Sequence, residues 1–300
     1  MSTNIKWFQT ALHLPNSVLP KVLGRVIIVV IFAILIAYIH SNVWSLNLPI
    51  LSSAIPTVVI GLLLVFRTNT AYERFWEGRK LWGKINSNIR NLSRQIWLGS
   101  TQETELKKQI LELLWVFAVS VKNKLRNQKI DPEVAITLDS KTLNQLNQSQ
   151  HLPLTVACLL QCQLQNYKTR TNLNDVAFGN LQLNLDSLIS AVGGCERILK
   201  TPIPLAYSIH IKQLILLFCF CLPFQFVGIL GYWSVIIVGL VSFAMMGIEE
   251  IAIEIENPFG NDGNDLPLDQ ICSTIRSNLD ELMTFDSSLT TNTKIKINLQ

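Results

Sequence analysis

The chain of 300 residues contains 49% apolar and only 15% charged residues, with a formal net charge of +4 and a mean hydropathy of +0.33. Ordinary soluble domains carry about 25% charged residues, so the composition excludes an ordinary cytosolic enzyme and a disordered chain. The charge excess is too small to indicate a polyanionic partner such as nucleic acid. The composition predicts a polytopic membrane protein in contact with lipid.

Two long windows, residues 26–66 and 213–248, contain no Lys, Arg, Asp or Glu. A polar break splits each window into two apolar runs, which gives the four runs 26–39, 50–66, 214–230 and 235–247. Each run approaches the roughly 17–25 residues of a membrane-spanning helix once its neutral flanks are added. The sequence therefore predicts four transmembrane helices, two within 26–66 and two within 213–251.

The positions of the basic residues indicate the topology. Of the 25 Lys and Arg residues, 19 lie within 67–212, and none lies in the short connections 40–49 and 231–234. The positive-inside rule places the basic side of a membrane protein in the cytoplasm. The segments 1–25, 67–212 and 252–300 are therefore expected on the cytoplasmic side of a cell (inner) membrane.

The segment 67–212 is predicted to be helical, because apolar residues recur at spacings of three and four and no long stretch alternates with period two. Three apolar faces support this: Ile110, Leu113, Leu114, Phe117, Val121 and Leu125; Leu159, Leu160, Leu164 and Tyr167; Leu181, Leu185, Leu188, Ile189 and Val192. The fold class is therefore predicted to be all-α. The pair Gly193-Gly194 follows the third face and is expected to end that helix.

Motifs of catalysis are absent from the sequence, which has no GxSxG, P-loop, HExxH or GxGxxG and only dispersed histidines. The chain is therefore not expected to be an enzyme or to require a cofactor. Cys158 and Cys162 lie one helical turn apart, but no His or second Cys pair accompanies them. We expect both thiols to be packed in a buried face rather than to bind zinc.

Three regions carry long, specific motifs, which are FRTNTAYERFWEGRKLWG at 66–83, GCERI at 194–198 with TPIP at 201–204, and ENPFG followed by NDGND at 256–265. These three regions resemble the bestrophin family in its prokaryotic form. Together with the four apolar runs, the resemblance covers nearly the whole chain. It implies a homopentameric ion channel with four spans per subunit, in which the second span lines a pore along the fivefold axis.

The resemblance places a hydrophobic pore neck at Val58, Leu62 and Phe66. Residues at i, i+4 and i+8 share one face of a helix, drifting only about 40° per step. Five copies of that face would form three apolar rings that gate by dewetting. Periodicity alone leaves open whether these side chains face a pore, lipid or a neighbouring helix. The neck of animal members carries Ile and two Phe, so this chain has fewer aromatic rings there.

A second constriction of the family lies on the cytosolic helix before the Gly-Gly-Cys motif. An ungapped count places this cytosolic aperture at Leu185. A small misalignment would move it to Leu181, Leu188 or Ile189. The alternative is that Leu185 belongs to the core of a helical bundle.

The acidic segment after the last span resembles the segment that binds Ca²⁺ in calcium-gated animal relatives. Ca²⁺ takes six to eight oxygen ligands. Because Gly263 and Asn264 interrupt the run of acids, the alternative is a capped loop that follows the last helix. Position for position, the oxygen ligands of a calcium clasp would be Glu254, Asn257, Asp262 and Asp265.

Four acids close the last span: Glu249, Glu250, Glu254 and Glu256. We expect them either to pair with Arg74, Arg79 or Lys80 across subunit interfaces or to line a vestibule that attracts cations. The segment 67–212 carries 19 basic against 11 acidic residues, and anion conduction is the commoner behaviour in the family. We therefore expect a passive channel for chloride and other small monovalent anions. A sodium channel of the same fold and a non-conducting regulatory assembly in the membrane are the alternatives.

Overall fold

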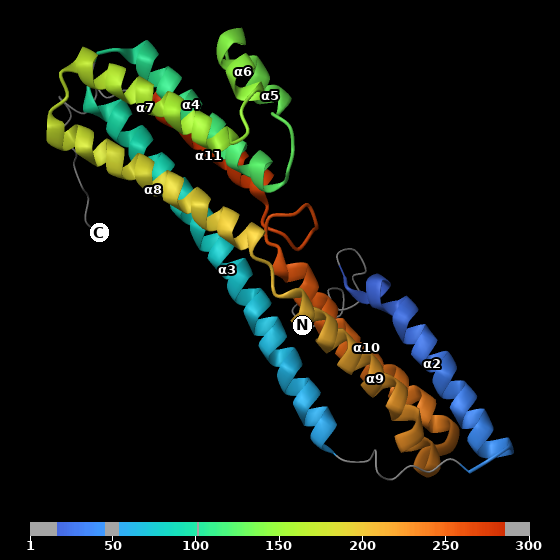
Figure 1. Ribbon diagram of the computed structural model, residues 1–300. Coiled ribbons are helices and arrows are strands. Elements are labelled where there is room, and N and C mark those ends of the chain that lie inside the picture. Colours follow the sequence, from blue (N-terminus) through green and yellow to red (C-terminus); the bar gives the residue numbers. More distant parts are fainter. Residues whose placement is uncertain (1–16, 46–53, 101, 286–300) are drawn as a thin grey trace, which may run out of the picture. The chain divides into compact units, whose positions relative to one another are not determined.

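A computed structural model describes residues 17–45, 54–100 and 102–285 (Figure 1). The regular structure of these residues is entirely helical, which confirms the predicted all-α class. In chain order the helices are α2 (Leu19–Asn42), α3 (Ala54–Gly99), α4 (Thr104–Leu125), α5 (Pro132–Thr137), α6 (Ser140–Asn147), α7 (Leu152–Thr171), α8 (Asp175–Lys200), α9 (Leu205–Leu230), the 3-10 helix η2 (Gly231–Trp233), α10 (Ser234–Glu256) and α11 (Leu268–Thr284).

The helices divide into two compact units. The described residues up to Trp76, together with Thr201–Asp265, form what we call the membrane unit. Glu77–Lys200, together with the described residues from Leu266 onwards, form what we call the polar unit. The predicted segments end at residues 66, 212 and 251, whereas the two compact units divide after Trp76, Lys200 and Asp265.

Helix α3 explains the first of these differences. It runs for 46 residues without a break, although the second predicted span ends at Phe66. No proline follows Pro56 in this helix, so nothing in the backbone stops it where the apolar run gives way to polar residues. Pro56 itself lies in the first turn, where a missing N–H is tolerated.

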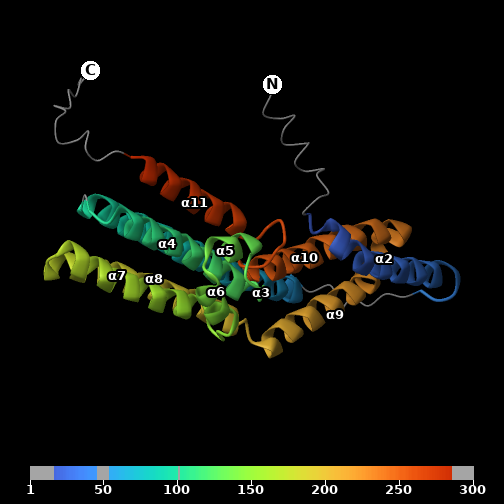
Figure 2. The ribbon, with the colours of Figure 1, turned by 90° about the horizontal axis from the view of Figure 1, so that it is seen from above.

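The membrane unit contains all four predicted spans. Figures 1 and 2 show α2, α9 and α10 side by side, and each of these helices contacts the other two. Apolar side chains from the three helices and from the first part of α3 form one buried cluster. Helices α2 and α3 and the stretch Leu205–Glu256 are each long and apolar enough to cross a membrane.

The stretch Leu205–Glu256 supplies two of the spans, because η2 divides its 52 residues into α9 and α10. Gly231 has φ of 54° and ψ of −129° at the end of α9. This backbone conformation is open to glycine and strained for residues with a Cβ atom. The turn lets α10 run back along α9, so each helix is about 35–39 Å long, enough for a hydrocarbon core of about 30 Å.

The polar unit is built around α4, which packs against α7, α8 and α11. The six predicted face residues of α4 are all buried, as are Leu160, Leu164 and Tyr167 of α7. The Tyr167 hydroxyl donates to the Ile96 carbonyl at 3.0 Å and so ties α7 to the end of α3. The three helices that the sequence predicts within 67–212 are therefore confirmed as helices of this unit.

The predicted helix stop at Gly193-Gly194 is wrong, because α8 continues to Lys200. A Cβ atom on Gly194 would lie 2.7 Å from Leu81 Cδ2, whereas a Cβ on Gly193 would meet no atom within 4 Å. Gly194 therefore allows α8 to approach α3 closely, and its lack of a side chain serves packing rather than helix termination.

The predicted burial of Cys158 and Cys162 is also wrong. Both thiols are exposed on α7, whose buried face is formed by residues such as Val156, Leu160 and Leu164. The two cysteines share a helical face, but it is the face that points away from the bundle.

Candidate ion pathway

Helix α3 presents Val58, Leu62 and Phe66 on its exposed side. Their exposed fractions are 65%, 53% and 54%, and no described residue of the chain covers them. Ile60 and Leu64, on the other side of the helix, pack into the buried cluster of the membrane unit. The apolar stripe (Val58, Leu62 and Phe66) therefore faces outwards from the single chain. This position is compatible with the predicted neck, which stays a prediction.

Arg67 follows the apolar stripe directly and is buried, with 2% of its surface exposed. Its Nη2 donates to Glu256 Oε2 at 2.6 Å, whereas Nε and Nη1 have no hydrogen-bond partner among the described atoms. Desolvation of both charges opposes this attraction, and removing one partner of a buried pair typically costs about 3–5 kcal/mol. The pair therefore holds α3 and the end of α10 in one arrangement.

Glu256 connects three segments that are far apart in the sequence. Its Oε1 accepts a hydrogen bond from the Ile203 amide at 2.9 Å, and its carbonyl accepts one from Arg74 Nε at 3.1 Å. Arg74 Nη1 also donates to the Thr201 carbonyl at 2.6 Å. The segments joined in this way lie within 66–83, 201–204 and 256–260. Sequence reasoning selected these segments by their motifs but did not find that Glu256 links them.

The other three acids at the end of α10 also form ion pairs within the membrane unit. The pairs are Glu249 with Lys212 (3.9 Å), Glu250 with Arg25 (2.8 Å) and Glu254 with Lys21 (2.9 Å). In each pair the carboxylate is buried and the cation is about half exposed. The described residues thus form ion pairs rather than a free acidic vestibule, and three of the partners lie on α2 and α9, which the sequence prediction did not name.

The predicted aperture residue Leu185 lies in the core of the polar unit. It is 2% exposed, and Leu181 and Leu188 are buried beside it on the same face of α8. A side chain that is covered within its own chain does not line a passage between copies. The structure therefore does not support an aperture at Leu185 and agrees with the alternative of a core leucine. Of Leu185 and the three alternative aperture positions, Ile189 is the one whose side chain is partly exposed.

The four predicted calcium ligands lie in and before the loop that follows α10. Glu254 Oε1 pairs with Lys21, and Glu254 Oε2 accepts a hydrogen bond from Asn264 at 2.6 Å. Asp265 Oδ2 accepts from the Asp262 amide at 2.7 Å, and Asn257 Oδ1 accepts from the Phe259 amide at 3.4 Å.

Side-chain oxygens of Glu254, Asn257 and Asp265 thus accept hydrogen bonds from protein donors. Among the described residues, no three His, Cys, Asp or Glu side chains are grouped so that they could hold a metal ion. In this arrangement the four side chains therefore do not fit a Ca²⁺ site. The arrangement corresponds to the alternative of a capped loop. The calcium clasp stays a prediction, and no step below depends on it.

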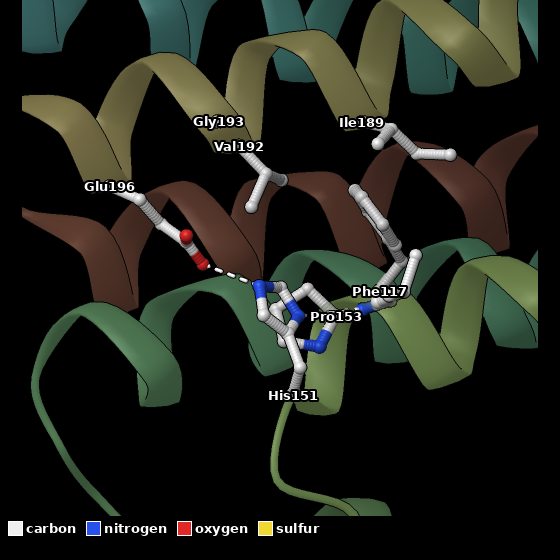
Figure 3. Close-up of a pocket in the computed structure, with 8 residues that line it drawn as sticks. Phe117, His151, Pro153, Ile189, Val192, Gly193 and Glu196 are labelled. Carbon is white, nitrogen blue, oxygen red and sulfur yellow. Dashed lines mark hydrogen bonds and ion pairs between the residues drawn. The ribbon is translucent and has the colours of Figure 1, made fainter.

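Figure 3 shows a pocket in the polar unit whose polar side chains are His151 and Glu196. His151 Nε2 lies 2.6 Å from Glu196 Oε1. The Leu154 amide donates to His151 Nδ1, so the ring proton is on Nε2 and points to the carboxylate. His151 thereby caps the first turn of α7, and the surrounding lining is apolar and includes Phe117. The pair orients two helices and is not accompanied by a nucleophile among the residues that line the pocket.

Similarity to known proteins extends over nearly the whole chain. A family model described as "Bacterial/Fungal Bestrophin protein" matches residues 1–281. The chain is 49% identical over 280 residues to a voltage-dependent anion channel-forming protein of Nostoc sp. (strain PCC 7120), covering 92% of this chain and 91% of that protein. It is 31% identical over 277 residues to the voltage-dependent anion channel-forming protein YneE of Escherichia coli (strain K12), covering 91% and 90%.

Solved structures show the same likeness in three dimensions. The crystal structure of a bacterial Bestrophin homolog from Klebsiella pneumoniae superposes with a TM-score of 0.81 at 28% identity. The superposition covers 87% of this chain and 98% of that chain.

Proposed function

Because the chain belongs to the bestrophin family of membrane channels, we propose that it is a passive channel for small monovalent anions, chloride above all. The observation that carries this proposal is the apolar stripe, which the second span presents outwards from a single chain. Two relatives support an anion rather than a cation as the conducted ion. Both are named as anion channel-forming proteins and match over about nine tenths of the chain.

The apolar stripe would act as the gate of this channel. Three apolar rings narrow enough to expel water oppose the passage of a hydrated ion, and small changes of diameter restore a conducting column of water. Apolar rings carry little information about the sign of the ion. The pairing of all four acids at the end of α10 leaves less free negative charge near the pathway, and the excess of basic residues in 67–212 favours anions.

Five copies around a common axis would surround the pathway on all sides, as the resemblance implies. An apolar stripe on a spanning helix gains partners when copies associate, and a ring of identical chains places the stripes opposite one another. We further propose that both termini lie in the cytoplasm. The paired charges at the ends of α2, α9 and α10 support a common side for these ends, because they bring the start of α2 and the end of α10 together.

Chloride efflux from liposomes tests the proposal. Purified protein is reconstituted into vesicles loaded with KCl, and external chloride is followed with an ion-selective electrode after valinomycin is added to carry K⁺. Efflux that requires both protein and valinomycin is expected. Efflux without valinomycin would mean that cations pass as well. No efflux above protein-free vesicles would contradict the proposal, since a cation-selective channel and a non-conducting assembly both give this result.

A further inference from the structure

A groove of about 460 Å³ lies in the membrane unit and has an apolar and a charged end. Ile28 of α2, Leu216 and Phe220 of α9 and Met246 of α10 form part of its apolar lining. Its charged end carries Arg25, Lys212 and Glu249. Ligand pockets in proteins have volumes of about 300–1,000 Å³, so the groove is large enough to hold part of a lipid molecule.

The position of the groove matches the profile of a membrane leaflet. Arg25 and Lys212 lie near the starts of α2 and α9, where charged residues give way to the charge-free spans. The apolar lining continues along the same helices into the membrane-spanning part. A molecule in this groove would meet cationic side chains at the level of the lipid headgroups and apolar side chains at the level of the acyl chains.

The two cations at the mouth keep hydrogen-bond donors for a ligand. The bond from Arg25 to Glu250 at 2.8 Å engages Nη1, and a guanidinium has five N–H donors. The Lys212 ammonium lies 3.9 Å from Glu249 Oε1, which is beyond hydrogen-bond distance. Both cations are about half exposed and their carboxylate partners are buried. The mouth therefore presents positive groups to the membrane, and an Arg with a Lys suits a phosphate.

Glu249 supplies a second and independent observation. The residue lines the groove, and its buried Oε1 has no hydrogen-bond partner among the described atoms. A buried carboxylate oxygen without a donor is costly. A ligand that fits this end of the groove would therefore carry a donor close to its phosphate.

We propose that this groove is a binding site for a glycerophospholipid whose headgroup donates hydrogen bonds, such as phosphatidylethanolamine or phosphatidylglycerol. The phosphate binds Arg25 and Lys212, the ammonium or hydroxyl of the headgroup donates to Glu249, and an acyl chain lies along Leu216 and Phe220. Such a site would make the packing of α2 against α9 depend on the lipid. The proposal does not depend on which ion the protein conducts.

Native mass spectrometry of the purified, delipidated protein in detergent tests the site with four separate probes. These are phosphatidylethanolamine, phosphatidylglycerol, phosphatidylcholine and diacylglycerol. The first two are expected to bind about tenfold more tightly than phosphatidylcholine, which has no donor beside its phosphate. Diacylglycerol, which lacks the phosphate, is expected at background level. Inorganic phosphate at millimolar concentration should not displace the lipid, because it fills none of the apolar groove.

Variants locate the binding. Lys212→Gln and Arg25→Gln should each weaken binding of the first two lipids about tenfold, and Leu216→Trp should do the same by filling the groove. Glu249→Gln should reduce the discrimination against phosphatidylcholine. Lys21→Gln is the matched control, because Lys21 is similarly exposed and paired with a buried acid but does not line the groove.

Should Arg25→Gln fail to fold, Lys212→Gln and Leu216→Trp carry the test. Equal binding of all three phospholipids would overturn the proposal, and so would unchanged binding in both of these variants. If none of the three added phospholipids binds to the unmodified protein, as expected if a second copy covers the groove, the proposal is also overturned.

Discussion

The buried Arg67, on the helix that carries the apolar stripe, forms an ion pair of 2.6 Å with the partly buried Glu256, the last residue of the last spanning helix. Arg67 is the immediate neighbour of Phe66, so this pair fixes the rotation of α3 at the end of the stripe. Through the Ile203 amide and the Arg74 side chain, the same glutamate holds the segment before α9. A change at Glu256 therefore reaches the candidate pathway through α3 without touching its apolar surface.

Removing one member of the pair should destabilise the protein strongly. We expect Glu256→Ala to lower the free energy of unfolding by about 3–5 kcal/mol, because it leaves the buried Arg67 guanidinium without its hydrogen-bonded carboxylate. The double variant Arg67→Met with Glu256→Ala should lose less than the sum of the two single changes. The midpoint of thermal unfolding in detergent measures both effects. Additive losses would contradict a direct interaction between the two side chains.

Widening the apolar stripe should favour the open channel. The triple change of Val58, Leu62 and Phe66 to Ala removes apolar bulk from exposed positions, so folding should be preserved while the dewetting barrier falls. We expect the open probability in a planar bilayer to rise about tenfold from a low value, which corresponds to a shift of the closed–open equilibrium by about 1.4 kcal/mol.

The matched control for the stripe is a triple change on α2. Ile27, Ile31 and Leu35 have the same spacing and comparable exposure, so their replacement by Ala removes similar bulk from another spanning helix. Its open probability should be that of the unmodified protein. Currents that are unchanged in the α3 variant, or raised equally in both variants, would place the gate elsewhere.

The adjacent glycines of α8 should respond in opposite directions to the same substitution. Gly194→Ala would bring a Cβ atom to 2.7 Å and 2.9 Å from the two terminal carbons of Leu81, and we expect a loss of about 1–3 kcal/mol from overpacking. Gly193→Ala meets no atom within 4 Å and should gain up to about 1 kcal/mol in helix propensity. Thermal unfolding of the two variants measures the difference, and equal midpoints would contradict close packing at Gly194.

Asp269 should contribute to the acid sensitivity of the polar unit. Its carboxylate accepts hydrogen bonds from Lys122 at 2.9 Å and Arg126 at 2.5 Å, and these bonds lower the pKa of Asp269 from its ordinary value of 3.8. A group with a lowered folded-state pKa stabilises the fold fully above its unfolded pKa, and this contribution is lost as the pH falls through the folded pKa. The loss therefore belongs to the range below about pH 4.

The variant Asp269→Asn tests this contribution. It should lower the free energy of unfolding at pH 7 by about 0.5–1 kcal/mol, a modest value because the carboxylate is exposed and screened by water. Below pH 4 the variant and the unmodified protein should converge in stability. Asp186→Asn, which removes an exposed carboxylate from α8, controls for the change of net charge. A constant difference between Asp269→Asn and the unmodified protein from pH 7 to pH 3 would contradict the assigned cause.

The sequence predicts the spans well because a membrane imposes a strict condition on them. A window such as 26–66 must exclude charge over a length set by the hydrocarbon core, and that condition is visible without any tertiary contact. The buried faces of α4 and α7 are predictable for a similar reason, because the apolar residues that recur at helical spacing are the residues that are buried.

Other features depend on distant parts of the chain, which local patterns do not report. Glu254 pairs with Lys21, more than 230 residues away in the sequence, and only the packing of α10 against α2 brings them together. Leu185 was placed by counting along the chain, and an error of one residue turns a helical side chain by about 100°. The sequence predicts that Gly194 ends a helix, whereas the close approach of Leu81 gives this glycine a role in packing.

The reversal potential of the purified protein in a planar bilayer under an asymmetric KCl gradient tests the central claim most directly. An anion channel gives a reversal potential close to the chloride equilibrium potential, and this is the result that the account predicts. A reversal potential close to the potassium equilibrium potential would contradict it, since the same fold would then conduct cations.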